Sequence, residues 1–249
     1  MTNNLRRLTA SLGLFCLIAL GSATASRADT FTFTGTPPGG SGPISATADI
    51  TQGAGGLITI TLTNNTANIQ DVSQAITDFK FSINGVSLTG FTGFTGSGRA
   101  INVASGGSFT EVGGTTAPDL ITGAGGWSLA STGPGTFYLN ALGSGQPQFA
   151  ILGPPNGSNL YSNANGSIAG NGPHNPFVDQ TATFSFTVTG LAPGATFTNV
   201  IMSFGTVPGS DIPGSRSVPE PASMVLLGTG LVSVAAGLRR RRKNKKEEL

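Results

Sequence analysis

Cysteine is almost absent from this 249-residue chain, because the one cysteine, Cys16, lies in an apolar segment near the N-terminus. No thiol follows that segment, which excludes a disulfide framework, a thiolate nucleophile and cysteine-ligated zinc or iron–sulfur centres in the rest of the chain. Any folded region must therefore be stabilised by packing and backbone pairing alone.

Histidine is equally scarce, since His174 is the only one. A histidine-cluster metal site is excluded, and a Ser-His-Asp triad would have to use this single ring. His174 lies in the turn-rich segment 172–176, and no Gly-x-Ser-x-Gly elbow precedes a helical segment. We therefore expect no catalytic residues, no metal ligands and no cofactor.

Basic residues are few between the two chain ends. Segment 29–217 has only Lys80, Arg99 and Arg216 against eight acidic residues, so its net charge is negative. Without a Lys/Arg patch, binding cannot gain from the counterions that nucleic acids release. We predict that this region binds no nucleic acid.

The acidic residues are isolated from one another in sequence. A glycosidase needs two carboxyl groups facing one sugar linkage, and the spacing of Asp78, Glu111, Asp119 and Asp179 predicts no such pair. We interpret them as surface turn residues. No Asp-x-Asp-x-Asp pattern is present, so whether the fold builds a calcium site stays open.

The N-terminus has the three parts of a secretory signal peptide, predicted over residues 1–28. An arginine pair precedes the apolar segment from Leu8 to Leu20, and small residues then offer cleavage after Ala25 or Ala28. The arginine pair also allows a twin-arginine signal, but two basic residues suffice for an ordinary leader. We expect export by the general secretory route.

The C-terminus, residues 218–249, has a second three-part pattern: a Pro-Glu-Pro motif, the apolar run 222–238 and a basic cluster. Moving each basic charge through hydrocarbon costs about 2.5–3.5 kcal/mol, so the pattern predicts one transmembrane helix with a cytoplasmic tail over 239–249. The stop-transfer residues are Arg239, Arg240, Arg241, Arg242, Lys243, Lys245 and Lys246.

This ending resembles the PEP-CTERM sorting signal of Gram-negative bacteria. The resemblance implies that a membrane protease of the exosortase type recognises Val218, Pro219, Glu220 and Pro221 and cleaves the signal. It also implies an inner-membrane intermediate followed by delivery to the cell surface or the extracellular space. The alternative is an uncleaved anchor that holds the domain in the periplasm on a single span.

Segment 29–217 reads as short strands in which large apolar residues alternate with Thr or Ser. This alternation predicts an all-β, single β-sandwich-like (jelly-roll-like) domain with the hydroxyls facing water. The clearest strands surround residues 31–34, 58–63, 79–83 and 183–188, and weaker ones are expected at 44–50, 101–104, 127–130, 136–139, 148–152 and 196–204.

Turn residues add local expectations. Asn84-Gly85 predicts a hairpin between residues 79–83 and 86–88, and segment 71–77 is the only one suited to a turn or two of helix. The Pro-, Asn- and Gly-rich segment 153–176 predicts a long ordered loop. Disorder is the alternative for so glycine-rich a chain, but the phenylalanines of the strands favour a packed core.

Amphipathic aromatic residues are the candidates for sugar contact. Trp127, Tyr138 and Tyr161 could stack on pyranose rings, and core or rim packing is the alternative role. Segments 166–177 and 199–206 resemble a group of uncharacterised exported bacterial proteins with C-terminal anchors, which implies a β-rich fold and no assigned activity. We predict a non-enzymatic surface or extracellular-matrix protein associated with exopolysaccharide; the alternative is a polysaccharide-acting enzyme.

Overall fold

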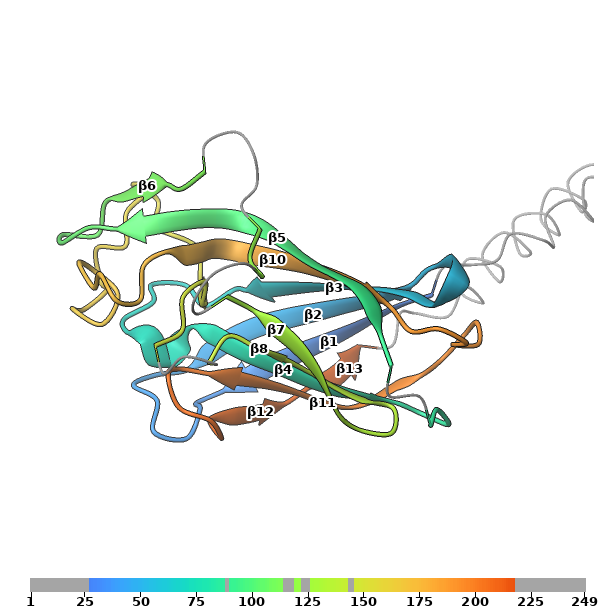
Figure 1. Cartoon of the computed structure of the whole chain (residues 1–249). Coiled ribbons are helices and arrows are strands. Elements are labelled where there is room, and N and C mark those ends of the chain that lie inside the picture. The colour runs from blue at the N-terminus through green and yellow to red at the C-terminus, as the bar shows by residue number, and fades with distance from the viewer. Residues whose placement is uncertain (1–26, 88–89, 114–118, 122–125, 143–145, 218–249) are drawn as a thin grey trace, which may run out of the picture.

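The computed structural model describes residues 27–87, 90–113, 119–121, 126–142 and 146–217. Its strands form one hydrogen-bonded, 13-stranded sheet that folds over on itself into two packed layers (Figure 1). This architecture confirms the all-β, sandwich-like prediction. The predicted signal peptide, residues 1–28, lies outside these ranges except for its last two residues, and so does the apolar segment 222–238. No helix within the described ranges is long and apolar enough to cross a membrane.

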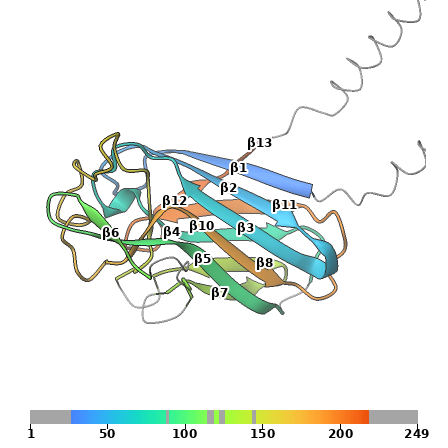
Figure 2. The same cartoon turned by 90° about the horizontal axis from the view of Figure 1, so that it is seen from above.

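The first layer is the larger one, and its strands pair antiparallel (Figure 2). In order across the layer they are β13 (Ser215–Ser217), β1 (Arg27–Gly35), β2 (Ile44–Gln52), β3 (Leu57–Asn64), β10 (Phe177–Thr187), β5 (Thr92–Val103) and β6 (Phe109–Glu111).

The second layer is also antiparallel, and the short strand β9 (Ile151–Leu152) joins it to the first. β9 pairs antiparallel with β4 in one layer and parallel with β10 in the other. The second layer runs β12 (Asp211–Pro213), β11 (Phe197–Phe204), β4 (Ile76–Ile83), β8 (Thr136–Asn140) and β7 (Ser128–Gly133).

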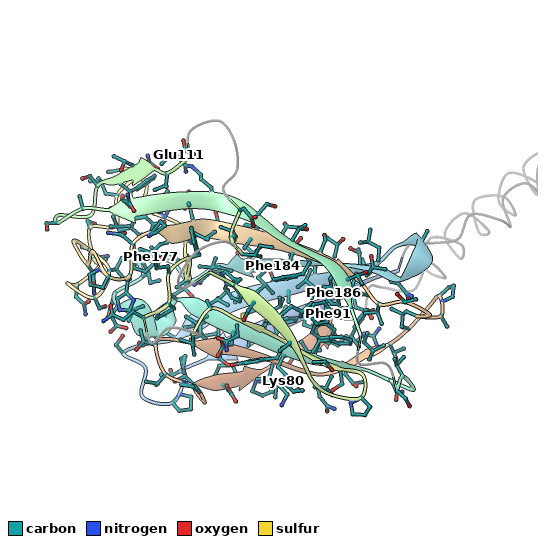
Figure 3. The ribbon with its side chains drawn as sticks, in the orientation of Figure 1. Lys80, Phe91, Glu111, Phe177, Phe184 and Phe186 are labelled. Atoms are coloured by element: carbon teal, nitrogen blue, oxygen red, sulfur yellow. The ribbon has the colours of Figure 1, made fainter. Side chains whose placement is uncertain are left out.

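The core between the layers consists of the apolar residues of the alternating strands. Phe81 is central: its ring stacks on Phe137 at 5.7 Å between centroids and also contacts Phe186 and Phe197. Figure 3 shows Phe184 and Phe186 between the layers, as expected for a face with period two. Since a large aromatic side chain buries about 150–250 Å², these rings supply the packing that replaces disulfides.

The two C-terminal strands, β12 and β13, connect the layers at one edge of the sandwich. β12 pairs with β11 in the second layer, whereas β13, one residue later, pairs with β1 in the first. The chain crosses between layers at Gly214, where an added Cβ would lie 2.8 Å from the Phe33 ring. Glycine is therefore required here because the crossing passes against a fully buried side chain.

The long loop 153–176 has a small hydrophobic cluster of its own. Tyr161 and Ile168 are buried in it together with Phe177 and the β5 residues Ile101 and Val103. Backbone hydrogen bonds, such as Tyr161 N–H to the Gly107 carbonyl at 2.8 Å, fix the loop to the domain. The prediction of an ordered loop is confirmed.

Two local predictions have different outcomes. Segment 71–77 contains the expected helical turn, the 3₁₀ helix η2 (Val72–Gln74), but its last two residues already belong to β4. A second 3₁₀ helix is η1 (Ala54–Gly56). The hairpin at Asn84-Gly85 is wrong: the turn exists, but Val86 and Ser87 form no strand, and Leu88 lies outside the described ranges. The strands that pair with β4 are instead β8, β9 and β11.

The start of β1 distinguishes the two predicted cleavage positions of the signal peptide by their effect on the sheet. β1 begins at Arg27, which lies opposite Gln52, and Ala28 lies opposite Thr51. Cleavage after Ala28 would remove these two residues from the sheet, whereas cleavage after Ala25 leaves the whole of β1 in the mature protein.

Candidate functional site

The outward side of the first layer is a surface of hydroxyl groups, here called the hydroxyl face. Its Thr and Ser residues come into register across neighbouring strands, so that they form continuous rows. The three rows are Ser217–Thr30–Asp49–Thr61–Thr183–Ser97, Ser215–Thr32–Thr47–Thr63–Thr181 and Thr51–Thr59–Ser185–Thr95.

Hydrogen bonds along these rows hold the hydroxyls in fixed positions. Thr61 and Thr183 pair at 3.3 Å between their hydroxyl oxygens, and Thr59 and Ser185 pair at 3.2 Å. Thr30 donates to Asp49, the one ionisable residue of the rows, at 2.5 Å. No member of the rows is buried, and each hydroxyl has a donor and two lone pairs, so the face keeps hydrogen-bonding capacity toward solvent.

The three aromatic candidates for sugar contact do not come together. Trp127 is 1% exposed, its indole N–H donates to the Phe149 carbonyl at 2.9 Å, and its ring lies 4.9 Å from that of Phe184. Tyr161 is 3% exposed, in the cluster beneath the long loop. Sugar stacking by Trp127 and Tyr161 is therefore a wrong prediction, because neighbouring side chains already cover both rings; Tyr138 alone is half-buried, on β8.

A second cluster lies on the outward side of the second layer, next to a cavity of about 240 Å³. In the strand register Asp78 lies opposite Ser203, which lies opposite Asp211, so the two acids come from β4 and β12 with β11 between them. Lys80 and Tyr138 also line the cavity. Sequence reasoning treated Asp78 as an isolated turn residue, because only the strand register reveals this row.

Asp78 is the most unusual residue of this cavity. It is 1% exposed, and neither of its carboxylate oxygens has a hydrogen-bond partner. Burial raises the pKa of Asp78 to about 6, and the charge of Asp211 adds to the rise. The Tyr138 hydroxyl and the Ala141 amide are close enough to moderate the pKa of Asp78, although neither reaches hydrogen-bond geometry.

Tyr138 and Asp211 complete the surroundings of this carboxylate. Burial, together with the charge of Asp78, raises the pKa of the Tyr138 hydroxyl above its ordinary value. Asp211 is exposed and accepts a hydrogen bond from the Ser203 hydroxyl at 2.6 Å. No ion pair within 4.0 Å joins Lys80 to either acid in the ranges that the structure covers. Figure 3 shows Lys80 on the outward side of this layer.

The other acids have structural partners. Arg99 pairs with Glu111 and, at 2.5 Å, with Asp179, which also accepts a hydrogen bond from the Tyr161 hydroxyl at 3.1 Å. These contacts fasten β5, β6 and β10 to the long loop. Asp119 has other contacts: it forms an isolated antiparallel bridge with Ser97, and its carboxylate accepts a hydrogen bond from the Ile121 amide.

His174 is also a structural residue by its contacts. Its ring is 8% exposed and lies 6.3 Å from that of Phe177, with Nδ1 3.4 Å from the Pro147 carbonyl. Among the described residues no group of three or more His, Cys, Asp or Glu could hold a metal ion.

The sequence motif at the C-terminus starts where the sheet ends. β13 finishes at Ser217, and Arg216 of the same strand pairs with the buried Asp29 on β1. Val218 to Pro221 and the basic residues from Arg239 to Lys246 lie outside the described ranges.

Comparison with known protein families shows that residues 217–242 match the model of the PEP-CTERM protein-sorting motif. No curated protein matches the chain. The motif confirms the resemblance of the C-terminus and implies processing by an exosortase, membrane association at the C-terminus and export to the cell surface.

Proposed function

We propose that this protein is a non-enzymatic component of the cell surface or extracellular matrix, and that its hydroxyl face binds exopolysaccharide. After export it would exist first as an inner-membrane intermediate, and removal of the anchor would release the β domain outside. The observation that carries the binding proposal is the set of in-register Thr and Ser rows across the first layer.

The chemistry of the face suits a polyhydroxylated polymer. Neighbouring strands lie about 4.7–4.9 Å apart and alternate residues on one strand about 6.5 Å apart, so the rows present hydroxyls as a two-dimensional array. A glycan chain can exchange hydrogen bonds with many such groups at once, each weak alone. The near absence of charge favours a neutral or weakly charged polymer over an ionic one.

The rival proposal is an enzyme acting on the polysaccharide, and its candidate acids are Asp78 and Asp211, which line one cavity. A general acid must come within hydrogen-bond distance of the glycosidic oxygen. The Asp78 oxygens each expose less than 1 Å², so a polymer cannot reach them without local opening. This burial supports the non-enzymatic proposal.

Binding is tested by sedimenting the protein with purified host exopolysaccharide. Thr61→Arg and Thr61→Glu each place a long charged side chain in the middle of the longest row, and both should reduce retention on the polymer. Ser82→Arg, on the outward side of β4 in the other layer, is the matched control and should leave retention unchanged. Equal retention of all three variants would contradict binding by the hydroxyl face.

The enzymatic rival has its own assay. Incubation with the same polysaccharide should release no soluble oligosaccharide from the wild-type protein. Release that disappears in Asp78→Asn or Asp211→Asn would overturn the non-enzymatic proposal.

A further inference from the structure

The row of Asp78, Ser203 and Asp211 lies on the second layer, away from the hydroxyl face, and contains a buried carboxylate without a partner. Asp78 is 1% exposed and both of its oxygens lack a hydrogen-bond partner. Burying an ionised carboxylate is strongly unfavourable unless a cation or hydrogen-bond donors compensate it. No basic residue lies within ion-pair distance of Asp78 in the described ranges.

The second carboxylate, Asp211, makes ionisation of the buried Asp78 still less favourable. Asp211 lines the same cavity, and its charge disfavours ionisation of Asp78. A bound cation would compensate both charges together. The cavity offers oxygen atoms of the right kind, since the hydroxyls of Ser203 and Tyr138 lie beside the two acids.

We propose that the cavity between β4, β8, β11 and β12 is a calcium site in which Asp78 and Asp211 supply the charged ligands and the hydroxyl of Ser203 a neutral one. Ca²⁺ takes oxygen ligands in flexible geometry and accepts water for the positions that the protein leaves open. Magnesium fits less well, because it demands near-ideal octahedral geometry.

The affinity follows from the charges around the cavity. Two carboxylates are few for calcium, and Lys80 places a positive charge at the same cavity. The dissociation constant should therefore fall in the range of about 10⁻⁴–10⁻³ M that is typical of extracellular calcium modules. The charge of Lys80 repels a cation, so removing it should strengthen calcium binding. A purely structural role of these residues would not predict that increase.

The experiment titrates CaCl₂ into the full-length protein in non-ionic detergent, followed by calorimetry and by the shift of the thermal unfolding midpoint. Wild-type protein should bind calcium and melt at a higher temperature with it. Asp78→Asn and Asp211→Asn should each weaken binding by about tenfold or more, the loss seen even for residues that only support metal ligands. Lys80→Gln should tighten binding several-fold, and Asp119→Asn, an acid outside the cavity, should match the wild type.

Three results would overturn the calcium site. The first is a wild-type protein whose midpoint does not move in millimolar calcium. The second is undiminished binding in Asp211→Asn, which replaces an exposed side chain and so is expected to fold. The third is a Lys80→Gln variant that binds calcium more weakly than the wild type.

Discussion

Replacing Asp78 with Asn should remove a loss of stability that the calcium-free wild-type protein suffers as pH rises. In the unfolded chain the pKa of an aspartate is 3.8, and in the folded protein burial raises the pKa of Asp78 to about 6. The folded state therefore binds the Asp78 proton more tightly than the unfolded state does. This contribution to stability is complete below pH 3.8 and is lost as pH rises through about 6.

The magnitude follows from the two pKa values. Their difference corresponds to about 3 kcal/mol of unfolding free energy, of which about 2.4 kcal/mol disappears between about pH 4 and about pH 8. Asparagine has no proton to lose, so the stability of Asp78→Asn relative to the wild type should increase by about that amount over the same interval. Groups that titrate alike in both proteins cancel from this comparison.

The assay is urea unfolding of both full-length proteins at these two pH values, in non-ionic detergent with excess chelator. Three groups face Asp78 and stay in both proteins: Tyr138 from β8, Asp211 from β12 and Lys80 from β4 itself. Asp211→Asn is the internal control. It should shrink the pH effect without abolishing it, because burial is the largest cause of the raised Asp78 pKa and the Asp211 charge a smaller one.

A difference between wild type and Asp78→Asn that is the same at both pH values would refute the reasoning. It would mean that Asp78 is better solvated, or better hydrogen-bonded, than its two unpartnered oxygens indicate. A stabilisation of the wild type with rising pH would refute the sign itself.

Three further predictions concern the crossing between the layers at Gly214, the core position of Trp127 and the proteolytic removal of the C-terminal tail. Gly214→Val should destabilise the domain by about 1–3 kcal/mol, because its Cβ would press on the buried Phe33 ring, and an unchanged thermal midpoint would contradict this. Trp127→Ala should cost about 3–5 kcal/mol of stability in urea unfolding, while the folded fraction sediments with exopolysaccharide as the wild type does; selective loss of binding would restore the stacking role. Mature protein from the native host should lack the basic tail, so mass spectrometry that finds peptides from 239–249 in the dominant form would favour the uncleaved anchor.

The strands that the sequence predicts correctly are those that are half-buried. In β1, β3 and β10 one side meets the core and the other meets water, so large apolar residues alternate with Thr or Ser. β5 escapes this pattern because its inward positions include Gly96 and Gly98. An added Cβ at Gly96 would lie 3.0 Å from the ring of Phe184, its partner on β10, so a residue that is distant in sequence determines the glycine.

The candidate sites depend on information that no local pattern contains. Alternation predicts that Asp78 faces outward, which it does, but an outward residue is expected to be solvated. The residues that line the cavity with it include some far away in the chain, such as Pro208 and Gly209. The hydroxyl rows likewise required the register of five antiparallel pairings, whereas the sequence alone indicates only that the hydroxyls face water.

The pairing of β1 with β13 sets the order in which an exported chain can fold. These strands are the first and last of the sheet, and the Thr30–Ser217 and Thr32–Ser215 pairs join positions more than 180 residues apart. A chain that is exported with its N-terminus first can assemble β1, β2 and β3 early. The edge beside β1 stays unpaired until residue 217 has crossed the membrane. The sorting motif begins at that same residue. Completion of the sandwich and presentation of the motif to its protease are therefore late events of one translocation, and the slow step of folding is expected there, where the contacts are least local.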